Sequence, residues 1–137
     1  MKTFVINLPD RKDRMQRFNA NNPYLEYETF KAVEGYKVGY EKLLSQGFDT
    51  DHNWIDPILK TPLTKGEVGC FLSHWHLWNK CIEKNEPIIV LEDDAILTDK
   101  FDVEEISKLK YDFVYLGWKE MDKSKEINDD LVIPVYP

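Results

Sequence analysis

The stretch Pro87-Ile88-Ile89-Val90-Leu91-Glu92-Asp93-Asp94-Ala95 decides how the rest of this chain is interpreted. Ile88 to Leu91 is an unbroken, mostly β-branched aliphatic run that is too short for a helix. It therefore predicts a strand buried on both faces, as in a parallel sheet. Three carboxylates follow directly, and they would repel one another at the end of such a strand unless a cation or a cationic ligand lay among them.

The position of these carboxylates predicts a binding site. In open α/β sheets, ligands bind outside the carboxyl ends of the strands, and Mg²⁺ and Mn²⁺ prefer oxygen ligands. The stretch therefore indicates a metal-assisted site for a nucleotide or a nucleotide sugar. The alternative is that Glu92, Asp93 and Asp94 only form a surface turn.

The composition predicts a single domain over residues 1–137. With 42% hydrophobic residues among 137, the chain suits one domain with its own core. The formal net charge of −7, from 18 basic and 25 acidic side chains, argues against a general nucleic-acid or anionic-membrane binder, because such proteins carry a basic surface.

We expect a cytoplasmic protein without a transmembrane segment. The apolar part of Met1 to Pro9 is too brief for a signal peptide or a membrane span, so it is expected to belong to the fold. Cys70 and Cys81 would lie about 16 Å apart in one predicted helix, which is too far for a disulfide. Reduced cysteines fit a cytosolic compartment.

The N-terminal segment predicts a strand followed by a basic helix. The strand is expected over Thr3–Leu8, with Asp10 as the N-cap of the helix. The first turns of this helix carry four cationic side chains, which have the wrong sign for the positive end of a helix dipole: Arg11, Lys12, Arg14 and Arg17. A bound phosphate or pyrophosphate would offset them, and so would a solvated helix paired by Asp10 and Asp13; both interpretations stay open.

The strongest helix signal begins at Thr64, where Thr64-Lys65-Gly66-Glu67 has the form of a capping box, and runs to about Lys84. Gly69 and Ser73 are expected on a side where a backbone or a ligand can come close. A separate stripe of apolar side chains is expected to pack on the sheet: Val68, Phe71, Leu72, Trp75, Trp78 and Ile82.

Two groups of side chains resemble metal ligands only in part. Cys70 and His74, four residues apart, could each supply one zinc ligand, but two ligands are too few and no partner pair is visible. A buried, hydrogen-bonded His74 is therefore favoured. His52, near Asp51 and Asp56, is expected in a solvated loop because the spacing matches no recognised ligand pattern.

The remaining sequence predicts three further strands and two short helices. Strands are predicted over Tyr24–Val33, Tyr111–Gly117 and Leu131–Tyr136, and short helices over Tyr40–Ser45 and Phe101–Leu109. A parallel strand ending at Gly117 would emerge at the same edge as the three acids. Pro134 would confine the last strand to an edge or a bend.

Three segments, taken in their order, carry a family resemblance. They are Phe4–Leu8 followed by Asp10–Arg14, then Gly66–Cys70 with Ser73-His74, and then Val90–Ala95. Together they resemble the glycosyltransferase family 25 proteins, which include lipooligosaccharide galactosyltransferases of bacteria and collagen galactosyltransferases. The resemblance runs along nearly the whole chain.

The resemblance implies a GT-A-like, Rossmann-type α/β fold with a mostly parallel sheet flanked by helices. It also implies transfer of a hexose, from a donor such as UDP-galactose, to a glycan or glycolipid acceptor in surface polysaccharide or lipooligosaccharide (lipopolysaccharide) synthesis. A divalent cation, usually Mn²⁺ (or Mg²⁺), would lie at the acidic motif and stabilise the departing nucleoside diphosphate. Because family members continue beyond the position of Pro137, we expect a domain that lacks the family's C-terminal segment.

The resemblance also assigns expected roles to residues. Glu92 and Asp94 would bind the metal ion, because alternate residues of an extended segment point the same way, and Asp93 would face the ribose or a structural partner. Four residues would line the donor-nucleotide pocket: Asn7, Leu8, Arg11 and Arg14. Three more match family motif positions near the donor: Glu67, Ser73 and His74. No catalytic base is assigned.

Two competing functions remain. A degenerate or truncated module would bind a nucleotide sugar without transferring it. A receiver-like or phosphatase-like domain would also place carboxylates after its strands, but such domains put an aspartate after an early strand, where this chain has Asn7-Leu8-Pro9. That function therefore ranks last.

Overall fold

The computed structural model describes residues 1–48, 60–116 and 133–134. The chain forms two compact units, Met1–Asp102 and Val103–Pro137, and each is described by itself. The first unit is built on a parallel sheet of three strands: β1 (Lys2–Asn7), β2 (Glu28–Lys31) and β3 (Ile88–Glu92). The strand predicted over Ile88–Leu91 is confirmed as β3, with Ile89 and Leu91 buried and the alternate residues half-buried.

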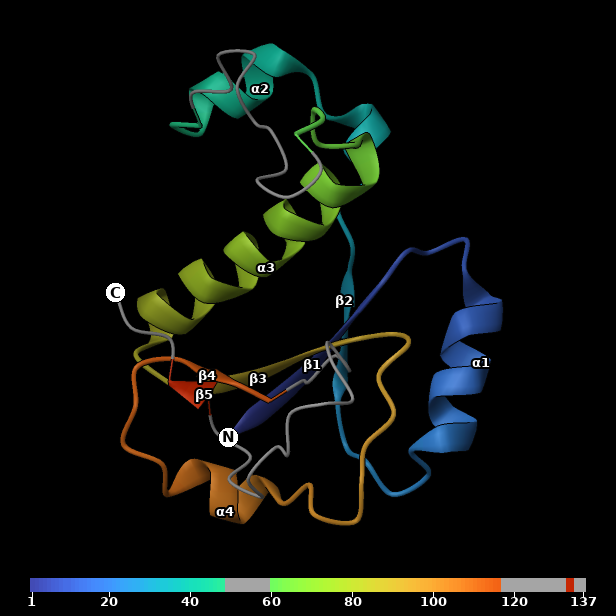
Figure 1. The fold of residues 1–137 in the computed structure, drawn as a ribbon, viewed down its shortest axis with the longest axis vertical. Helices are drawn as coiled ribbons and strands as arrows, with labels where there is room; N and C mark the ends of the chain where they lie inside the picture. The colour runs from blue at the N-terminus through green and yellow to red at the C-terminus, as the bar shows by residue number, and fades with distance from the viewer. Residues whose placement is uncertain (49–59, 117–132, 135–137) are drawn as a thin grey trace. The chain divides into compact units, whose positions relative to one another are not determined.

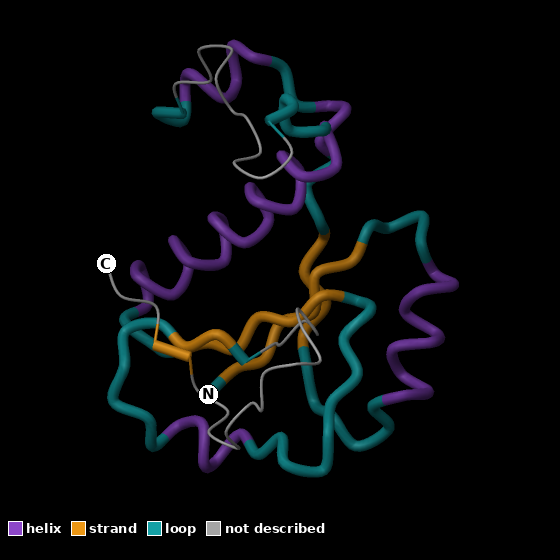
Figure 2. The backbone as a smooth tube through the Cα atoms, in the orientation of Figure 1, coloured by secondary structure: helices purple, strands orange, loops and turns teal. Residues whose placement is uncertain are grey.

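The strand order is β2-β1-β3, so β1 lies between its two partners (Figures 1 and 2). The chain adds β2 along one edge of β1 and later adds β3 along the other edge. α1 (Lys12–Asn21) joins β1 to β2, and α3 (Lys65–Lys84) precedes β3. Figure 1 shows these two helices on either side of the strands. The predicted α/β, GT-A-like fold with a Rossmann-type parallel sheet flanked by helices is thus confirmed.

The core lies between the sheet and α3. Four buried residues from β1, α3 and the position directly after β2 form its centre, and half-buried side chains from the strands and the residue after β1 pack around them: Phe4, Ile6, Ala32 and Leu77, surrounded by Leu8, Phe30, Ile88 and Val90. This burial fixes β1 as the central strand, because its side chains from Phe4 to Ile6 are almost wholly covered.

The start of α1 differs from the prediction. Arg11, not Asp10, occupies the N-cap position, and no side chain caps the helix there. The reason is that the turn after β1 takes up more of the chain than expected: the Arg11 backbone N–H donates to the Leu8 carbonyl at 2.9 Å, so Asp10 is still within the turn. Phe18 is the buried residue of this helix.

Strand β2 is shorter than the predicted Tyr24–Val33, because only four of its residues pair with β1. The pairs run from Phe4 opposite Glu28 to Asn7 opposite Lys31, where β1 ends. The chain after β2 forms a short 3-10 helix, η1 (Gly35–Lys37), and then α2 (Tyr40–Ser45), whose predicted bounds are confirmed.

The capping box of α3 is confirmed. Thr64 Oγ1 accepts a hydrogen bond from the Glu67 N–H at 3.2 Å, and a Glu67 carboxylate oxygen accepts from the Thr64 N–H at 2.6 Å. At its other end the helix stops at Lys84 as predicted, and Asn85 follows in the left-handed conformation that commonly ends helices.

The predicted core-facing stripe of α3 is partly wrong. Its buried residues are Gly69, Leu72, Ser73 and Leu77, whereas Trp78 is 37% and Ile82 is 75% exposed. The small residues of α3 decide which face of the helix packs inward. A Cβ atom at Gly69 would lie 2.5 Å from the Val33 carbonyl oxygen, so the helix approaches the segment after β2 by its small face.

The placement of Gly69 and Ser73 away from the packed side is therefore wrong, but the expected close approach of a backbone is correct. The aromatic side chains on the neighbouring face of α3 instead contact the end of the α2 region. Phe48 makes edge-to-face contacts with Phe71 and Trp75, with ring centroids 5.5 and 4.9 Å apart.

The second unit contains α4 (Val103–Ser107), β4 (Val114–Tyr115) and β5 (Ile133–Pro134). The strand predicted over Tyr111–Gly117 is present as the shorter β4, and the parallel pairing that would bring its end beside the three acids is not found in the part of the chain that the structure describes, because β4 pairs antiparallel with β5. Pro134 lies in a two-stranded sheet, where every strand is an edge strand, in agreement with the restriction expected for proline.

Several predicted features lie outside the described residues, namely the loop with His52, the end of the strand at Gly117, and the chain around Leu131 and Tyr136. Among the helices that are described, none combines the length and the apolar character needed to cross a membrane. Both cysteines are free thiols.

Candidate functional site

The carboxyl ends of β1 and β3 lie side by side, with Ile6 opposite Glu92 in the register. The chain continues from β1 toward α1 and from β3 into the acidic residues, so two segments that are distant in sequence meet at one edge of the sheet. This is the point where the strand order reverses, which is where open α/β sheets bind their ligands.

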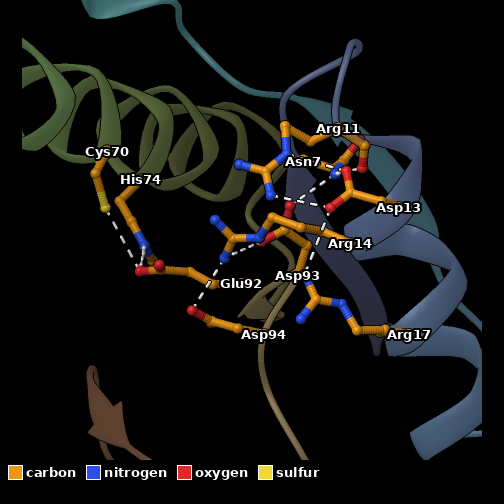
Figure 3. A network of polar contacts seen from close by, with 10 residues as sticks. All are labelled: Asn7, Arg11, Asp13, Arg14, Arg17, Cys70, His74, Glu92, Asp93 and Asp94. Atoms are coloured by element: carbon orange, nitrogen blue, oxygen red, sulfur yellow. Dashed lines mark hydrogen bonds and ion pairs between the residues drawn. The ribbon is translucent and has the colours of Figure 1, made fainter.

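Asp93 is the centre of a buried polar network at this edge (Figure 3). Its Oδ2 accepts a hydrogen bond from Asn7 Nδ2 at 2.6 Å, and its Oδ1 lies 2.5 Å from Arg14 Nη2. Asn7 and Asp93 are both buried. A buried carboxylate is costly unless it is paired and hydrogen-bonded, so these two partners make the position of Asp93 possible.

Arg14 connects the two neighbouring acids. Its Nη2 lies 3.0 Å from Asp94 Oδ2 as well as 2.5 Å from Asp93 Oδ1. The Asp94 side chain is 70% exposed, whereas that of Asp93 is 7% exposed. Asp93 thus has the surroundings of a structural partner, and Asp94 presents its carboxylate to solvent.

Glu92 contacts a different pair of side chains, both on α3. Its Oε1 lies 3.2 Å from His74 Nε2 and 3.5 Å from Cys70 Sγ. Because a carboxylate can only accept, the imidazole and the thiol are the donors. The predicted hydrogen bond of His74 is present, although its side chain is 24% exposed rather than buried.

These contacts change the acidity of both partners. The hydrogen bond from His74 is the main reason that the pKa of Glu92 is lowered from its ordinary value. The pKa of the Cys70 thiol is raised to about 11, first by burial and then by the negative charge of Glu92. In the free protein Glu92 is therefore ionised and Cys70 protonated at neutral pH.

The sequence left two interpretations open for the basic start of α1, a solvated helix with paired charges and a site for a phosphate, and its arginines differ in which one they follow. Arg11 forms two hydrogen bonds to Asp13, each 3.0 Å long, and Arg17 Nη2 lies 3.4 Å from Asp13. Arg11 lowers the pKa of Asp13 to about 2. Arg11 and Arg17 thus follow the solvated, paired arrangement, while Arg14 points to the acids after β3.

A cavity of about 230 Å³ adjoins this network. Of the predicted site residues, five line it: Leu8, Arg14, Ser73, Glu92 and Asp93. The opposite wall comes from the segment after β2, including Val33 and the largely exposed Tyr36. Sequence reasoning missed this wall, because that segment has no clear periodicity; its one signal was Gly35, whose Cβ would clash with the Lys65 carbonyl oxygen.

Two predicted site residues are engaged in local structure. Ser73 is fully buried; its hydroxyl accepts from the Val33 N–H at 2.8 Å and donates to the Gly69 carbonyl at 2.7 Å. Glu67 belongs to the capping box and is not among the residues that line the cavity. The Ser73 contact ties α3 to the segment after β2, whereas the Glu67 contact only caps the start of α3.

The donor set at the end of β3 fits a hard divalent cation. Glu92 and Asp94 offer carboxylate oxygens with exposed fractions of 48% and 70%, and such oxygens are the ligands that Mg²⁺ and Mn²⁺ prefer. Arg14 holds Asp94 by one oxygen, Oδ2, at a distance typical of an ion pair. Binding of a cation by Asp94 therefore has to compete with this pair.

Known proteins resemble this chain along most of its length. A family model described as glycosyltransferase family 25 (LPS biosynthesis protein) matches residues 1–133. A human protein named inactive glycosyltransferase 25 family member 3 is 34% identical over 137 residues, covering 91% of this chain and 23% of the relative.

Two other relatives carry names that state an activity. Procollagen galactosyltransferase 1-B of Xenopus laevis is 35% identical, covering 88% of this chain and 21% of the relative. Procollagen galactosyltransferase 2 of Mus musculus is 33% identical, covering 86% and 21%. The chain thus spans less than a quarter of the length of these curated relatives.

Proposed function

Because the chain belongs to glycosyltransferase family 25, we propose that it acts as a metal-dependent glycosyltransferase that moves a sugar from a nucleotide-sugar donor to a glycan acceptor. The names of the procollagen galactosyltransferases support galactose, and hence UDP-galactose, as the donor chemistry. The description of the family as LPS biosynthesis proteins supports a glycolipid or surface polysaccharide as the acceptor. The cytoplasmic location stays a prediction.

One observation carries this proposal. The cationic side chain of Arg14 meets the acids after β3 beside a cavity, at the edge where the strand order of the parallel sheet reverses. A nucleoside diphosphate needs this combination. Its phosphate oxygens bind guanidinium groups and divalent metal ions, and its base and sugar need a partly apolar cavity.

Glu92 and Asp94 are the proposed ligands of Mn²⁺ or Mg²⁺, which would supply Lewis-acid stabilisation of the charge on the departing nucleoside diphosphate. Arg14 would bind the diphosphate, exchanging part of its contact with Asp94 for phosphate oxygens. Asn7 and Asp93 hold Arg14 in position, since Asn7 orients the carboxylate that Arg14 contacts.

Other residues of the chain have supporting roles in this proposal. Leu8 lines the cavity and excludes water from the bound donor. His74 orients Glu92 through its hydrogen bond. Arg11 reaches a phosphate only by giving up its pair with Asp13. No residue is proposed as the catalytic base.

Calorimetry with UDP-galactose, with and without Mn²⁺, tests the proposal. We expect binding that strengthens with Mn²⁺, and a loss of roughly tenfold or more in the Mn²⁺-dependent affinity in Asp94→Ala, as for the loss of other metal-site groups. Asp99→Ala, which removes an exposed acid further along the chain, is the matched control. Binding that is independent of Mn²⁺ and unchanged by Asp94→Ala would contradict the proposed role of Asp94 as a metal ligand. The absence of UDP-galactose binding would contradict UDP-galactose as the donor.

A second function is a module that binds the donor without transferring the sugar, because one relative at 34% identity is named inactive. Donor hydrolysis or sugar transfer measured on the same samples distinguishes the two. Mn²⁺-dependent release of UDP supports a transferase, whereas tight binding without turnover supports the module.

A further inference from the structure

Three side chains of different chemistry converge beside the proposed donor site. Cys70 and His74 lie one turn apart on α3, and Glu92 ends β3 (Figure 3). Their ligand atoms, Sγ, Nε2 and a carboxylate oxygen, all lie within 4.8 Å of one another. The sequence offered only Cys70 and His74, because Glu92 is 18 residues further along the chain than His74.

We propose that Cys70, His74 and Glu92 form a binding site for a borderline transition-metal ion such as Zn²⁺. On binding the ion, the Cys70 thiol gives its proton to solvent, and His74 carries its ring proton on Nδ1 so that Nε2 is free to bind. Thiolate and imidazole ligands favour Zn²⁺ and Co²⁺, whereas Mn²⁺ and Mg²⁺ favour all-oxygen sites. The site is thus chemically distinct from the oxygen-ligand pair Glu92 and Asp94.

Two of the three distances in the triad match those of a tetrahedral ion. With metal–sulfur distances of about 2.3 Å and metal–nitrogen or metal–oxygen distances of about 2.0–2.1 Å, neighbouring ligand atoms lie roughly 3.4–3.6 Å apart. The Cys70–Glu92 and His74–Glu92 distances are 3.5 and 3.2 Å. The third pair, Cys70 Sγ and His74 Nε2, lies within 4.8 Å, close enough for one ion to bind all three atoms after an adjustment of these two side chains.

The triad also leaves access to a fourth ligand. Cys70 and Glu92 both line the cavity, so water or a small ligand can reach the ion. Three protein ligands with one open position are typical of zinc sites that exchange a ligand, whereas structural zinc sites have four protein ligands.

Glu92 belongs both to the triad and to the proposed Mn²⁺ site, so the two ions compete for it; this consequence rests on the proposed function. An ion held by Cys70, His74 and Glu92 withdraws Glu92 from the Mn²⁺ site. Zn²⁺ then lowers the Mn²⁺-dependent affinity for UDP-galactose, and a chelator restores it.

Titration of the untagged, reduced, metal-free chain with Co²⁺ tests the triad without any activity measurement. We expect one equivalent of Co²⁺ to give the intense visible bands of a tetrahedral ion and a thiolate-to-cobalt charge-transfer band, both removed by Zn²⁺. Cys70→Ser is expected to lose the charge-transfer band and to bind Co²⁺ at least tenfold more weakly. Cys81→Ser, on the same helix, is the matched control, because its Sγ donates to the Glu86 carbonyl and lies outside the triad.

The control also serves as an independent test. The chain has two cysteines, so a thiolate band that persists in Cys81→Ser arises from Cys70, even if Cys70→Ser proves unstable by circular dichroism. A spectrum without a thiolate band, a six-coordinate spectrum, or the loss of the band in Cys81→Ser overturns the proposal.

Asp94→Ala separates the two metal sites. It is expected to keep the cobalt–thiolate band while losing Mn²⁺-dependent donor binding. If the cobalt band is present and UDP-galactose does not bind with or without Mn²⁺, the proposed function fails and the triad stands. If the donor binds and the band is absent, the triad fails alone.

Discussion

At the residue scale, Asp93 and Asp94 are neighbours with the same side chain and opposite surroundings. Asp93 is buried and accepts from Asn7 and Arg14, while Asp94 is exposed and has Arg14 as an exchangeable partner. The backbone turn after β3 produces this difference, because it directs one carboxylate into the sheet edge and the next into solvent. Asp93 is therefore expected to contribute mainly to stability, and Asp94 mainly to ligand binding.

We predict that Asp93→Ala lowers the free energy of unfolding by about 1–3 kcal/mol, because it leaves one N–H of the buried Asn7 amide and part of the Arg14 guanidinium without an acceptor. The Asn7 amide keeps its second acceptor, the Arg11 carbonyl at 3.2 Å. Asp94→Ala is expected to lower it by at most about 1 kcal/mol, as for an exposed ion pair. Urea denaturation followed by circular dichroism measures both. Equal losses in the two variants would contradict the structural role of Asp93.

At the element scale, α3 is positioned by its small residues. Gly69 lies against the carbonyl of Val33, and the Ser73 hydroxyl accepts from the Val33 N–H one turn later. This contact brings Cys70 and His74, on the adjoining part of the helix, to the end of β3. The geometry of the triad thus depends on two positions that have no side-chain chemistry directed at a ligand.

Gly69→Ala is predicted to destabilise the protein by about 1–3 kcal/mol or more, because its Cβ would lie 2.5 Å from the Val33 oxygen and 2.9 Å from the Gly35 nitrogen, both backbone atoms. Gly66→Ala, on the same helix, is the control: the nearest atom, Thr64 Oγ1, is 3.8 Å away. It is expected to be neutral or to stabilise by up to about 1 kcal/mol, because alanine favours helix. Thermal denaturation of the pair checks the contact, and a neutral Gly69→Ala would refute it.

At the scale of the whole molecule, every residue of the candidate site lies in the unit Met1–Asp102. The site draws on β1, α1, the segment after β2, α3 and the end of β3. Ligands that bind there contact most elements of this unit, so binding is expected to stabilise the folded state as a whole.

We predict that UDP together with Mn²⁺ raises the melting temperature more than the sum of their separate effects. A ligand at 100 times its dissociation constant stabilises the folded state by about 2.7 kcal/mol. Asp94→Ala should lose the Mn²⁺-dependent part of the shift, and Asp99→Ala should retain it. Differential scanning calorimetry measures the shifts; purely additive effects in the unsubstituted protein would contradict a shared metal–diphosphate site.

Local patterns determined much of this protein. The aliphatic run before Glu92, the capping box at Thr64 and the short helix Tyr40–Ser45 are confirmed, because each depends on residues that are close in sequence. The order of the three family segments likewise predicted the family and its parallel sheet. The family resemblance named Asn7 and Arg14 as expected site residues, and the position of Glu92 and Asp94 directly after a buried strand indicated the acids as well.

Only the tertiary structure decided which of these residues meet. Asn7 and Asp93 are 86 residues apart, and their hydrogen bond depends on β1 and β3 being neighbours. The rotation of α3 followed from a backbone contact at Gly69, although hydrophobic periodicity favoured a stripe that includes Trp78 and Ile82. Periodicity records which side chains are apolar, whereas burial also depends on how closely two backbones approach. The close approach of α3 to the segment after β2 placed His74 and Cys70 beside Glu92 at the end of β3.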